Sequence, residues 1–391
     1  MTDSRQLFVT LMQGFCKHVP RAKFGDIRRL VTLAWAVVGL CISKTVNFSQ
    51  WGESVMSKAK KAASHKRRFQ RWFHNKHIIP CSFYAPLVKA ALHGWELTES
   101  VYVALDTSVL PRGYVLIRVA LVYRGRTVPL AWSVIKHGSA TVGYTTYEGV
   151  LRQAIAALPS GCAIIWLADR GFLHRQLVRF VKQRPKDHYR IRAKSSTLVR
   201  FADRHVSSMG KLCPPAGHAH FYHDVSILDE NIGTAHVALA NPLDSEDPWY
   251  IITDQFSDVA TFEEYGLRFD IEEGFLDDKS NGFQLESTRL DDADSISRLF
   301  LVLAVASLHF TSVGTAVVKH DLRTWVDTHW DRGMSYFKIG WSWLRQQFRR
   351  GWSPFAPFQL DPGPDPQPAI ASRRKAAEPK PTWIVAHLSS P

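Results

Sequence analysis

Residues Tyr265 to Lys279 have the sequence YGLRFDIEEGFLDDK, in which an apolar residue recurs at every fourth position. These apolar residues are Leu267, Ile271 and Phe275. Their spacing predicts a single helix whose apolar stripe faces a core. Gly274 lies inside the stretch and weakens a helix by about 1 kcal/mol relative to alanine. The stretch therefore becomes informative only together with the rest of the chain.

Four polar residues of this stretch fall on one side of the predicted helix. At about 100° per residue, they lie within about 60° of one another. They offer a phenol, a guanidinium, a carboxylate and an ammonium group: Tyr265, Arg268, Glu272 and Lys279. A solvated face joined by salt bridges is the ordinary meaning of such a pattern. The neighbouring acids lie away from Glu272 on the helix and are expected to be surface residues: Glu273, Asp277 and Asp278.

Two upstream segments each combine a short apolar run with a carboxylate. Their sequences are VYVALDTSVL over Val101–Leu110 and AIIWLADRGF over Ala163–Phe172. Each β-type run ends in an acid, Asp106 or Asp169, where we expect the strand to stop. One such acid is more often a turn residue than a catalytic one. Two of them with Glu272 can hold two Mg²⁺ ions about 3.5–4 Å apart, an arrangement that catalyses in-line phosphoryl transfer.

The chain resembles a known family at these residues. The Y-x2-R-x3-E-x6-K spacing from Tyr265 to Lys279 matches the Y-R-E-K signature of bacterial cut-and-paste insertion-sequence transposases with a D-D-E triad. The segments VALDTS and LADRGF resemble the first and second acid segments of that family. The resemblance covers residues 20–315 and implies an RNase H-like catalytic domain. It also implies which residues are catalytic and bind the metal: Asp106, Asp169 and Glu272.

The resemblance implies an activity, a cofactor and partners. Two Mg²⁺ ions are the expected cofactor, and Mn²⁺ is expected to substitute because hard oxygen ligands suit both metals. Water cuts one strand at a transposon end, and the freed 3′-hydroxyl forms a hairpin with the opposite strand. Water then reopens the hairpin, and the 3′-hydroxyl attacks target DNA. The partners are double-stranded DNA, as inverted-repeat ends and target, and a second copy in a homodimer assembled on the ends. Three side chains are expected to bind the 5′ phosphate of the other strand: Tyr265, Arg268 and Lys279.

Trp249 lies in the segment PWYIITD. It resembles a tryptophan that, in relatives, begins a WxxxT strand and stacks on a flipped base near the cleaved end. A buried core tryptophan is the alternative. The gap from Trp249 to Tyr265 is shorter than expected for the family.

Lys58–His77 is a basic segment without acids, KAKKAASHKRRFQRWFHNKH. A solvated basic face is one explanation, but uniform charge repels itself and pairs with nothing nearby. Contacts with DNA phosphates explain it better, with the interleaved aromatic residues anchored in the core. The arginines expected to contact DNA are Arg67, Arg68 and Arg71.

The order of the remaining patterns predicts an α/β protein. The expected order β-β-β-α-β-α-β over residues 101–193 matches an RNase H-like mixed five-stranded sheet, with Asp106 and Asp169 on neighbouring strands. A β-rich insertion interrupts this sheet, and a further helix is expected over 286–318. The predicted division is a helical DNA-binding region at 1–95, a catalytic domain at 96–193 and 257–318, the insertion at 194–256, a helical region at 319–360, and a disordered basic tail at 361–391.

Composition narrows the functional class. The formal net charge is +14, which favours a polyanionic partner such as nucleic acid. The five cysteines are scattered without a CxxC pair, which indicates reduced thiols and neither a disulfide framework nor a zinc site. With no secretory signal visible, we expect a cytoplasmic, nucleoid-associated protein.

Three other functions compete with a transposase. One is an RNase H-like nuclease that cuts DNA without joining it, and a strand-transfer assay separates the two. Another is an inactive DNA-binding derivative, against which the intact acids argue. The third is a membrane protein built on Leu299–Val318, which is long and nearly uncharged. Its several polar residues favour a buried core helix, and no membrane partner is expected.

Overall fold

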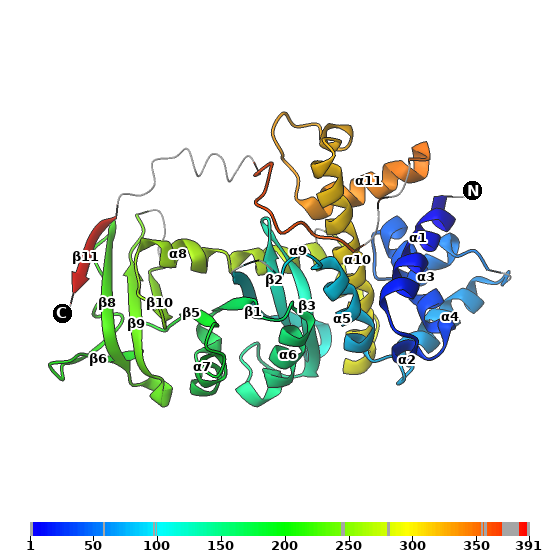
Figure 1. The fold of residues 1–391 in the computed structure, drawn as a ribbon. Helices are drawn as coiled ribbons and strands as arrows, with labels where there is room; N and C mark the ends of the chain where they lie inside the picture. Colours follow the sequence, from blue (N-terminus) through cyan, green and yellow to red (C-terminus); the bar gives the residue numbers. More distant parts are fainter. Residues whose placement is uncertain are drawn as a thin grey trace.

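The computed structural model describes residues 3–388 except 58, 97, 99, 244–246, 280–281, 353–354, 356–357 and 370–382. In Figure 1, helices of the N-terminal region lie at one end of the molecule and a group of long β-strands at the other. A mixed sheet connects the two ends.

The expected five-stranded sheet is confirmed. Its strands follow the order β3-β2-β1-β4-β5. They span β1 Ser100–Leu110, β2 Tyr114–Tyr123, β3 Arg126–Lys136, β4 Ala163–Ala168 and β5 His188–Arg192. The first three strands are antiparallel neighbours, whereas β4 runs parallel to both β1 and β5. The helices of this region are α6 Tyr144–Ala157 and α7 Arg175–Lys182, and the fold is therefore mixed α/β, as expected for an RNase H-like domain.

Strand β1 does not stop at Asp106, which corrects the sequence-based boundary. Its pairing with β2 continues to Leu110, opposite Tyr114. Its pairing with β4 ends earlier, at Leu105 opposite Ala168. Asp106 therefore lies inside β1 but one residue beyond the last pair with β4. Because β4 ends at Ala168, no β4 residue pairs with Asp106.

The insertion extends the same sheet. Its strand β10 pairs antiparallel with β5, and the order continues β10-β9-β8-β6-β7. These strands span β6 Leu198–Arg200, β7 Val206–Ser208, β8 His218–Ile227, β9 Gly233–Ala240 and β10 Trp249–Thr253. The five strands confirm that the insertion is rich in β-structure.

The predicted single helix over Tyr265 to Lys279 is wrong in one respect. The structure has two helices, α8 Val259–Gly266 and α9 Phe269–Asp278. Between them, Arg268 N donates to Tyr265 O at 2.9 Å and Ile271 N donates to Arg268 O at 3.0 Å. These are i to i+3 bonds, which tighten the turn and rotate one helix relative to the other. Arg268 and Glu272 still meet, through a hydrogen bond of 2.7 Å, whereas Lys279 lies beyond the end of α9.

Helix α10, Ala293–Lys319, comes late in the sequence but packs against helices of the N-terminal region. It begins at Ala293 and not at residue 286, because Asp292 accepts a hydrogen bond from Ser295 N at 2.7 Å and caps it. By length and composition it is the one single described helix that qualifies as a membrane span, although a bent pair formed by α3 and residues 48–54 also passes the test. The most apolar window of α10 is 89% buried inside the protein, and the helix packs against α3, α5, α11 and β3. This burial favours a core helix.

The described helices of residues 1–95 form the N-terminal region, and α3, α4 and α5 pack against α10. They are α1 Asp3–His18, α2 Arg21–Phe24, α3 Ile27–Ser43, α4 Ala62–Phe73 and α5 Pro80–Ala91. Helix α11, Tyr336–Arg350, crosses α10 in the C-terminal region. Glycines 314 and 340 face the backbone of the opposite helix at this crossing, so the two backbones approach more closely than any larger side chain would allow.

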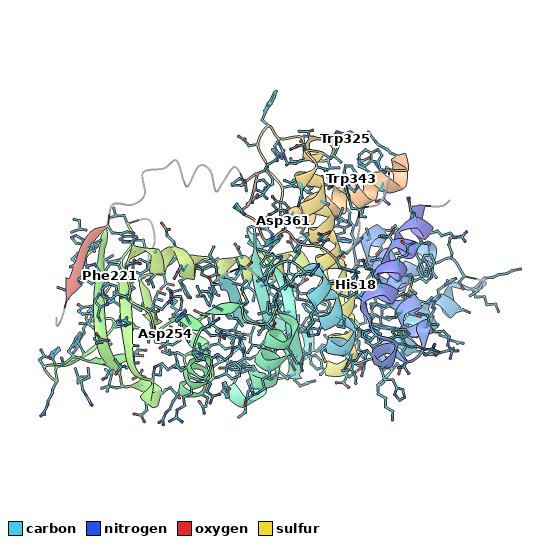
Figure 2. All side chains as sticks on the ribbon, in the orientation of Figure 1. His18, Phe221, Asp254, Trp325, Trp343 and Asp361 are labelled. Carbon is cyan, nitrogen blue, oxygen red and sulfur yellow. The ribbon has the colours of Figure 1, made fainter. Side chains whose placement is uncertain are left out.

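The predicted disorder of residues 361–391 is wrong for the part of the tail that the structure describes. Asp361 accepts a hydrogen bond from Lys319 Nζ at 2.9 Å, and Figure 2 shows it beside the C-terminal helices. Asp365 accepts from Arg332 Nη2 at 2.9 Å. Further on, β11 Ile384–Leu388 pairs parallel with β8. Composition misled here because ion pairs and strand pairing, rather than apolar burial, hold these residues.

Candidate active site

Asp106 and Asp169 lie side by side at the end of β4. Leu105 and Ala168 are the last paired residues of the two parallel strands, so each aspartate is the next residue on its own chain segment. Both line a hollow of about 670 Å³. The buried apolar runs of β1 and β4 thus fix two carboxylates at one sheet edge, as the sequence predicts.

The carboxyl group of Asp106 is largely buried, with its side chain 15% exposed. Thr107 N donates to its Oδ1 at 2.7 Å, and Arg268 Nη1 donates to its Oδ2 at 3.1 Å. Burial raises the pKa of Asp106 to about 6; Arg268 acts in the opposite direction, and Asp169 and Glu272 add to the rise. Asp106 thus lies within the electrostatic reach of both other predicted catalytic acids.

Arg268 joins the first and third acids of the predicted triad. Its Nη2 donates to Glu272 Oε1 at 2.7 Å, while its Nη1 holds Asp106. Arg268 is only 4% exposed, whereas the side chain of Glu272 is 51% exposed. In this arrangement the guanidinium faces carboxylates, so its expected contact with a DNA phosphate requires it to exchange partners.

Tyr265 and Trp249 pack against each other on the other side of the kink. Their ring centroids are 5.6 Å apart at an interplanar angle of 78°. Tyr265 has no exposed surface, and the centroid of its ring lies 5.8 Å from the guanidinium of Arg268. Trp249 is half-buried and also contacts Phe262 and Phe269. A contact of Tyr265 with DNA therefore requires α8 to move, while Trp249 retains an exposed part.

Lys279 follows the last residue of α9 and lies apart from Arg268 and Glu272. Its Nζ donates to Val109 O at 3.2 Å and lies 3.2 Å from Glu286 Oε1. The structure thus connects Arg268 and Glu272 directly with Asp106, and holds Lys279 at the end of β1.

A buried ion pair beneath α9 was missed by the sequence analysis. Arg118 on β2 donates through Nη1 to Asp278 Oδ2 at 2.7 Å and through Nη2 to Ile271 O at 2.8 Å. Asp277 and Asp278 are 6% and 3% exposed, so the expectation that they are surface acids is wrong. The signal was a single arginine in the apolar strand VLIRVALVY, since a buried charge requires a partner.

Gly274 makes room for this arginine. A Cβ at residue 274 would lie 2.7 Å from both Arg118 Nη2 and Thr127 Oγ1. The glycine that weakens the helix in sequence terms therefore allows α9 to pack closely on the sheet. This packing positions Glu272 on the first turns of α9.

Basic side chains also line the hollow that contains the two aspartates. They are Arg170, His174 and Lys194. Asp229 and Glu230, from the turn between β8 and β9, line it as well. The sequence gives only a weak signal for these residues, because the strands of the insertion bring them there from distant positions.

Helix α4 carries the basic segment. Its aromatic residues Phe69 and Phe73 are fully buried, which confirms that an aromatic face anchors it. Arg67 and Arg71 are exposed, but Arg68 is half-buried and its Nε donates to Thr32 Oγ1 at 3.3 Å. In Figure 1, α10 and β3 lie between α4 and β1, the strand that carries Asp106, so this surface is separate from the acids.

The donor chemistry of the three acids suits Mg²⁺, since all are hard oxygen ligands. Among the described residues, however, no three His, Cys, Asp or Glu side chains are already arranged to hold a metal ion. Glu272 is held by Arg268. The three acids therefore have suitable ligand atoms and lie near one another. Glu272 must release its hydrogen bond to Arg268 before it can bind a metal ion.

No family model matches this sequence, and no curated protein matches it. Among solved structures, it is similar to the cryo-EM structure of the piggyBac transposase synaptic complex with hairpin DNA. The identity is 10% and the TM-score 0.40, and the match covers 96% of this chain and 89% of that chain. A similarity of this degree does not establish function, so the functional argument rests on the residues of the site.

Proposed function

We propose that this protein is a DNA transposase that cleaves transposon ends and joins them to target DNA by metal-dependent phosphoryl transfer. One observation carries the proposal. Asp106 and Asp169 stand at adjacent positions of parallel strands and line one hollow, and Arg268 connects Asp106 to Glu272. Separate buried elements thus bring three acids, far apart in sequence, into one electrostatic unit.

Asp106, Asp169 and Glu272 would hold Mg²⁺, which supplies activation of the attacking oxygen and stabilisation of the leaving oxygen. Mn²⁺ would serve as well. The residues of the chain then have distinct tasks. Arg268 keeps Asp106 and Glu272 together before DNA arrives and can turn to a phosphate when Glu272 is released, because a guanidinium binds carboxylates and phosphates with the same geometry.

Several finer points belong to the same proposal. The cut-and-paste route proceeds through a hairpin, with Trp249 stacked on a displaced base and with Tyr265 and Lys279 on the other strand. A homodimer assembles on the two DNA ends, and the protein acts in the cytoplasm on the nucleoid. Helix α4 supports the DNA contact, since Arg67 and Arg71 are exposed on an anchored helix.

A second candidate is an RNase H-like nuclease that cuts DNA without joining it. The packing of Tyr265 against Trp249 favours it, because two groups assigned to the hairpin are engaged with each other. The acids serve both candidates equally well, so products and not residues must separate them.

The test uses the purified protein, a duplex carrying the inverted-repeat ends of its own element, and a supercoiled target plasmid. With one strand labelled, a denaturing gel separates the nicked strand from the hairpin, and a native gel detects the label joined to the plasmid. The proposal predicts all three products in Mg²⁺. Nicks without joined plasmid would favour the nuclease, and the absence of any cut would reject both candidates.

A further inference from the structure

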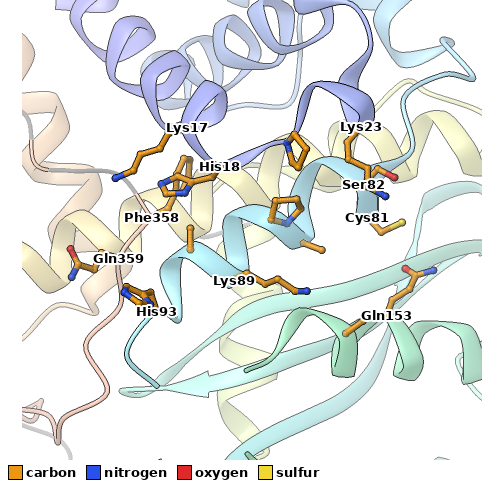
Figure 3. Close-up of a pocket in the computed structure, with 15 residues that line it drawn as sticks. Lys17, His18, Lys23, Cys81, Ser82, Lys89, His93, Gln153, Phe358 and Gln359 are labelled. Carbon is orange, nitrogen blue, oxygen red and sulfur yellow. The ribbon is translucent and has the colours of Figure 1, made fainter. Parts of the chain in front are cut away.

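A second basic surface lies far along the chain from the acids and apart from α4. It is a hollow of about 1010 Å³ between α1, α2, α5 and α6, shown in Figure 3. Lys17 and Lys23 stand on one wall and Lys89 rises from α5. Two histidines also line the hollow: His18, next to Lys17 at the end of α1, and His93, just after α5.

The three lysines have no acidic partner. Lys17, Lys23 and Lys89 are exposed, and none of them forms an ion pair or a side-chain hydrogen bond with a described residue. Lining residues of this hollow include no carboxylate within the described chain. Burial, and then the charge of Lys17, lower the pKa of His18. The hollow is therefore a region of unbalanced positive charge.

The hollow is part of a longer groove. A second hollow of about 530 Å³ shares Lys89 and Ala156 with it; Glu96 also lines this hollow, and its Arg184 is paired with Asp187. A third, of about 550 Å³, shares His93 with the first and contains the ion pair between Lys319 and Asp361, so the unpaired charge is that of the three lysines of the first hollow. The central helix α5 has 12 residues, which is a length of about 18 Å. This corresponds to about five nucleotide steps of one DNA strand at 3.4 Å each.

The floor of the groove has small side chains. On α5 they include Ser82, Ala85 and Ala90, and Ala156 of α6 lies beside them. Small residues allow a backbone to approach closely, and lysines on the rim provide point charges for phosphates. Phe358 also lines the hollow but is buried, and lysines form the exposed rim. Protein–protein interfaces are depleted of lysine, so this rim suits nucleic acid better than a protein partner.

We infer that this groove along α5 binds the sugar–phosphate backbone of double-stranded DNA without reading its sequence. No residue of α4 lines it, so it adds a contact to the one proposed for Arg67 and Arg71. The inference rests on the proposed function to the extent that both require DNA as the ligand. It assigns to Lys17, Lys23 and Lys89 a phosphate contact each.

The test measures binding of a labelled duplex of arbitrary sequence by fluorescence anisotropy over a range of salt concentrations. The variant is Lys17→Gln, Lys23→Gln and Lys89→Gln together. Its matched control neutralises three exposed lysines outside the groove: Lys182, Lys186 and Lys211. Each lost phosphate contact lowers the slope of log affinity against log salt by about 0.9. We expect the groove variant to lose about 2–3 in slope and at least about tenfold in affinity at moderate salt, and the control to lose much less.

A second measurement needs no variant. Lysine acetylation of the intact protein, followed by mass spectrometry, is compared with and without the duplex. We expect DNA to protect Lys17, Lys23 and Lys89. Equal acetylation of these lysines, or a salt slope like that of the control, in a protein that binds and cuts DNA would overturn this inference alone. A wild-type protein that binds no DNA would overturn the proposed function as well.

Discussion

Arg268 is the residue on which the local electrostatics of the site depend. It is nearly buried and holds one carboxylate from β1 and one from α9. Without it, Asp106 would face Asp169 and Glu272 in a poorly solvated place. The site therefore contains its own counter-charge, and the cost of burying Asp106 is still not fully offset, as the raised pKa of this carboxyl indicates.

The free-energy cost of burying the charged Asp106 carboxylate leads to a prediction for the Asp106→Asn variant. Burial raises the pKa of Asp106 to about 6, against 3.8 for an ordinary aspartate. Between these values the unfolded chain releases a proton that the folded chain keeps, so the free energy of unfolding falls as pH rises. The Asn variant avoids this loss. At pH 7.5 in a chelator, we expect its free energy of unfolding to exceed that of the wild type by about 1–3 kcal/mol, with cleavage abolished.

Urea unfolding of both proteins at pH 5 and pH 7.5 checks this prediction. The gain of the Asn variant should be smaller at pH 5, where more of the folded wild type is protonated. A gain that is larger at pH 5, or a variant less stable at pH 7.5, would show that Asp106 is stabilised rather than strained by its surroundings.

Trp249 allows a second prediction at this scale. Its ring packs on Tyr265, Phe262 and Phe269 but stays partly exposed. Stacking on a displaced base contributes about 1–3 kcal/mol, so Trp249→Ala should slow hairpin formation about tenfold or more and leave the first nick nearly unchanged. Trp249→Phe should be milder. Equal slowing of both steps on a denaturing gel would assign Trp249 to packing alone.

At the scale of elements, the kink between α8 and α9 and the close packing of α9 on the sheet decide where Glu272 lies. Helix propensity alone predicts that Gly274→Ala stabilises the protein by about 1 kcal/mol. The structure predicts the opposite, because the new Cβ would press on Arg118 and Thr127. Overpacking of this kind costs about 1–3 kcal/mol.

Gly149→Ala is the matched control for Gly274→Ala. Gly149 lies in α6, and a Cβ there meets no atom within 4 Å. We expect this variant to raise the free energy of unfolding by up to about 1 kcal/mol. Chemical denaturation of the two variants should give changes of opposite sign. Stabilisation by both would mean that α9 does not pack as closely as described.

The proposed DNA contact of helix α4 can be tested by comparing its exposed arginines, Arg67 and Arg71, with the half-buried Arg68. Arg67→Gln with Arg71→Gln should weaken binding to transposon ends and lower the salt slope by about 2. Arg68→Gln should change the slope less, since Arg68 donates to Thr32. A salt titration of both variants and the wild type decides the matter, and an identical slope for the double variant and the wild type would remove α4 from the DNA contact.

At the scale of the whole molecule, the sheet positions Asp106 and Asp169, helix α9 positions Glu272, and other helices carry the basic surfaces. The sequence predicted the five central strands and the neighbouring positions of Asp106 and Asp169, because buried apolar runs are a local signal. It did not predict the contact of Arg268 with Asp106 or that of Arg118 with Asp278. Both join residues about 160 positions apart, and no local pattern encodes such a pairing.

The contrast between local patterns and distant contacts also explains the other differences between the predicted and the observed elements. Periodicity over Tyr265 to Lys279 was correct for helix but could not show the tightened turn at Arg268, which hydrogen bonding sets. The hairpin β6–β7 is too short for a pattern, and β11 exists because β8 offers it an edge. These elements depend on contacts with residues far away in the sequence, which a short stretch of sequence does not contain.

The central claim is that Asp106, Asp169 and Glu272 act as one metal-dependent DNA-cutting unit. The most direct measurement is the rate of nicking at labelled transposon ends in Mg²⁺ by the wild type and by three single variants, Asp106→Ala, Asp169→Ala and Glu272→Ala. Glu273→Ala is the control, because Glu273 is the adjacent acid and pairs with Arg126 rather than with Arg268. The account predicts that each of the three loses at least about a thousandfold in rate while still binding the ends, and that Glu273→Ala cuts normally. Normal cutting by Glu272→Ala together with loss in Glu273→Ala, or cutting by any of the three at the wild-type rate, would contradict it.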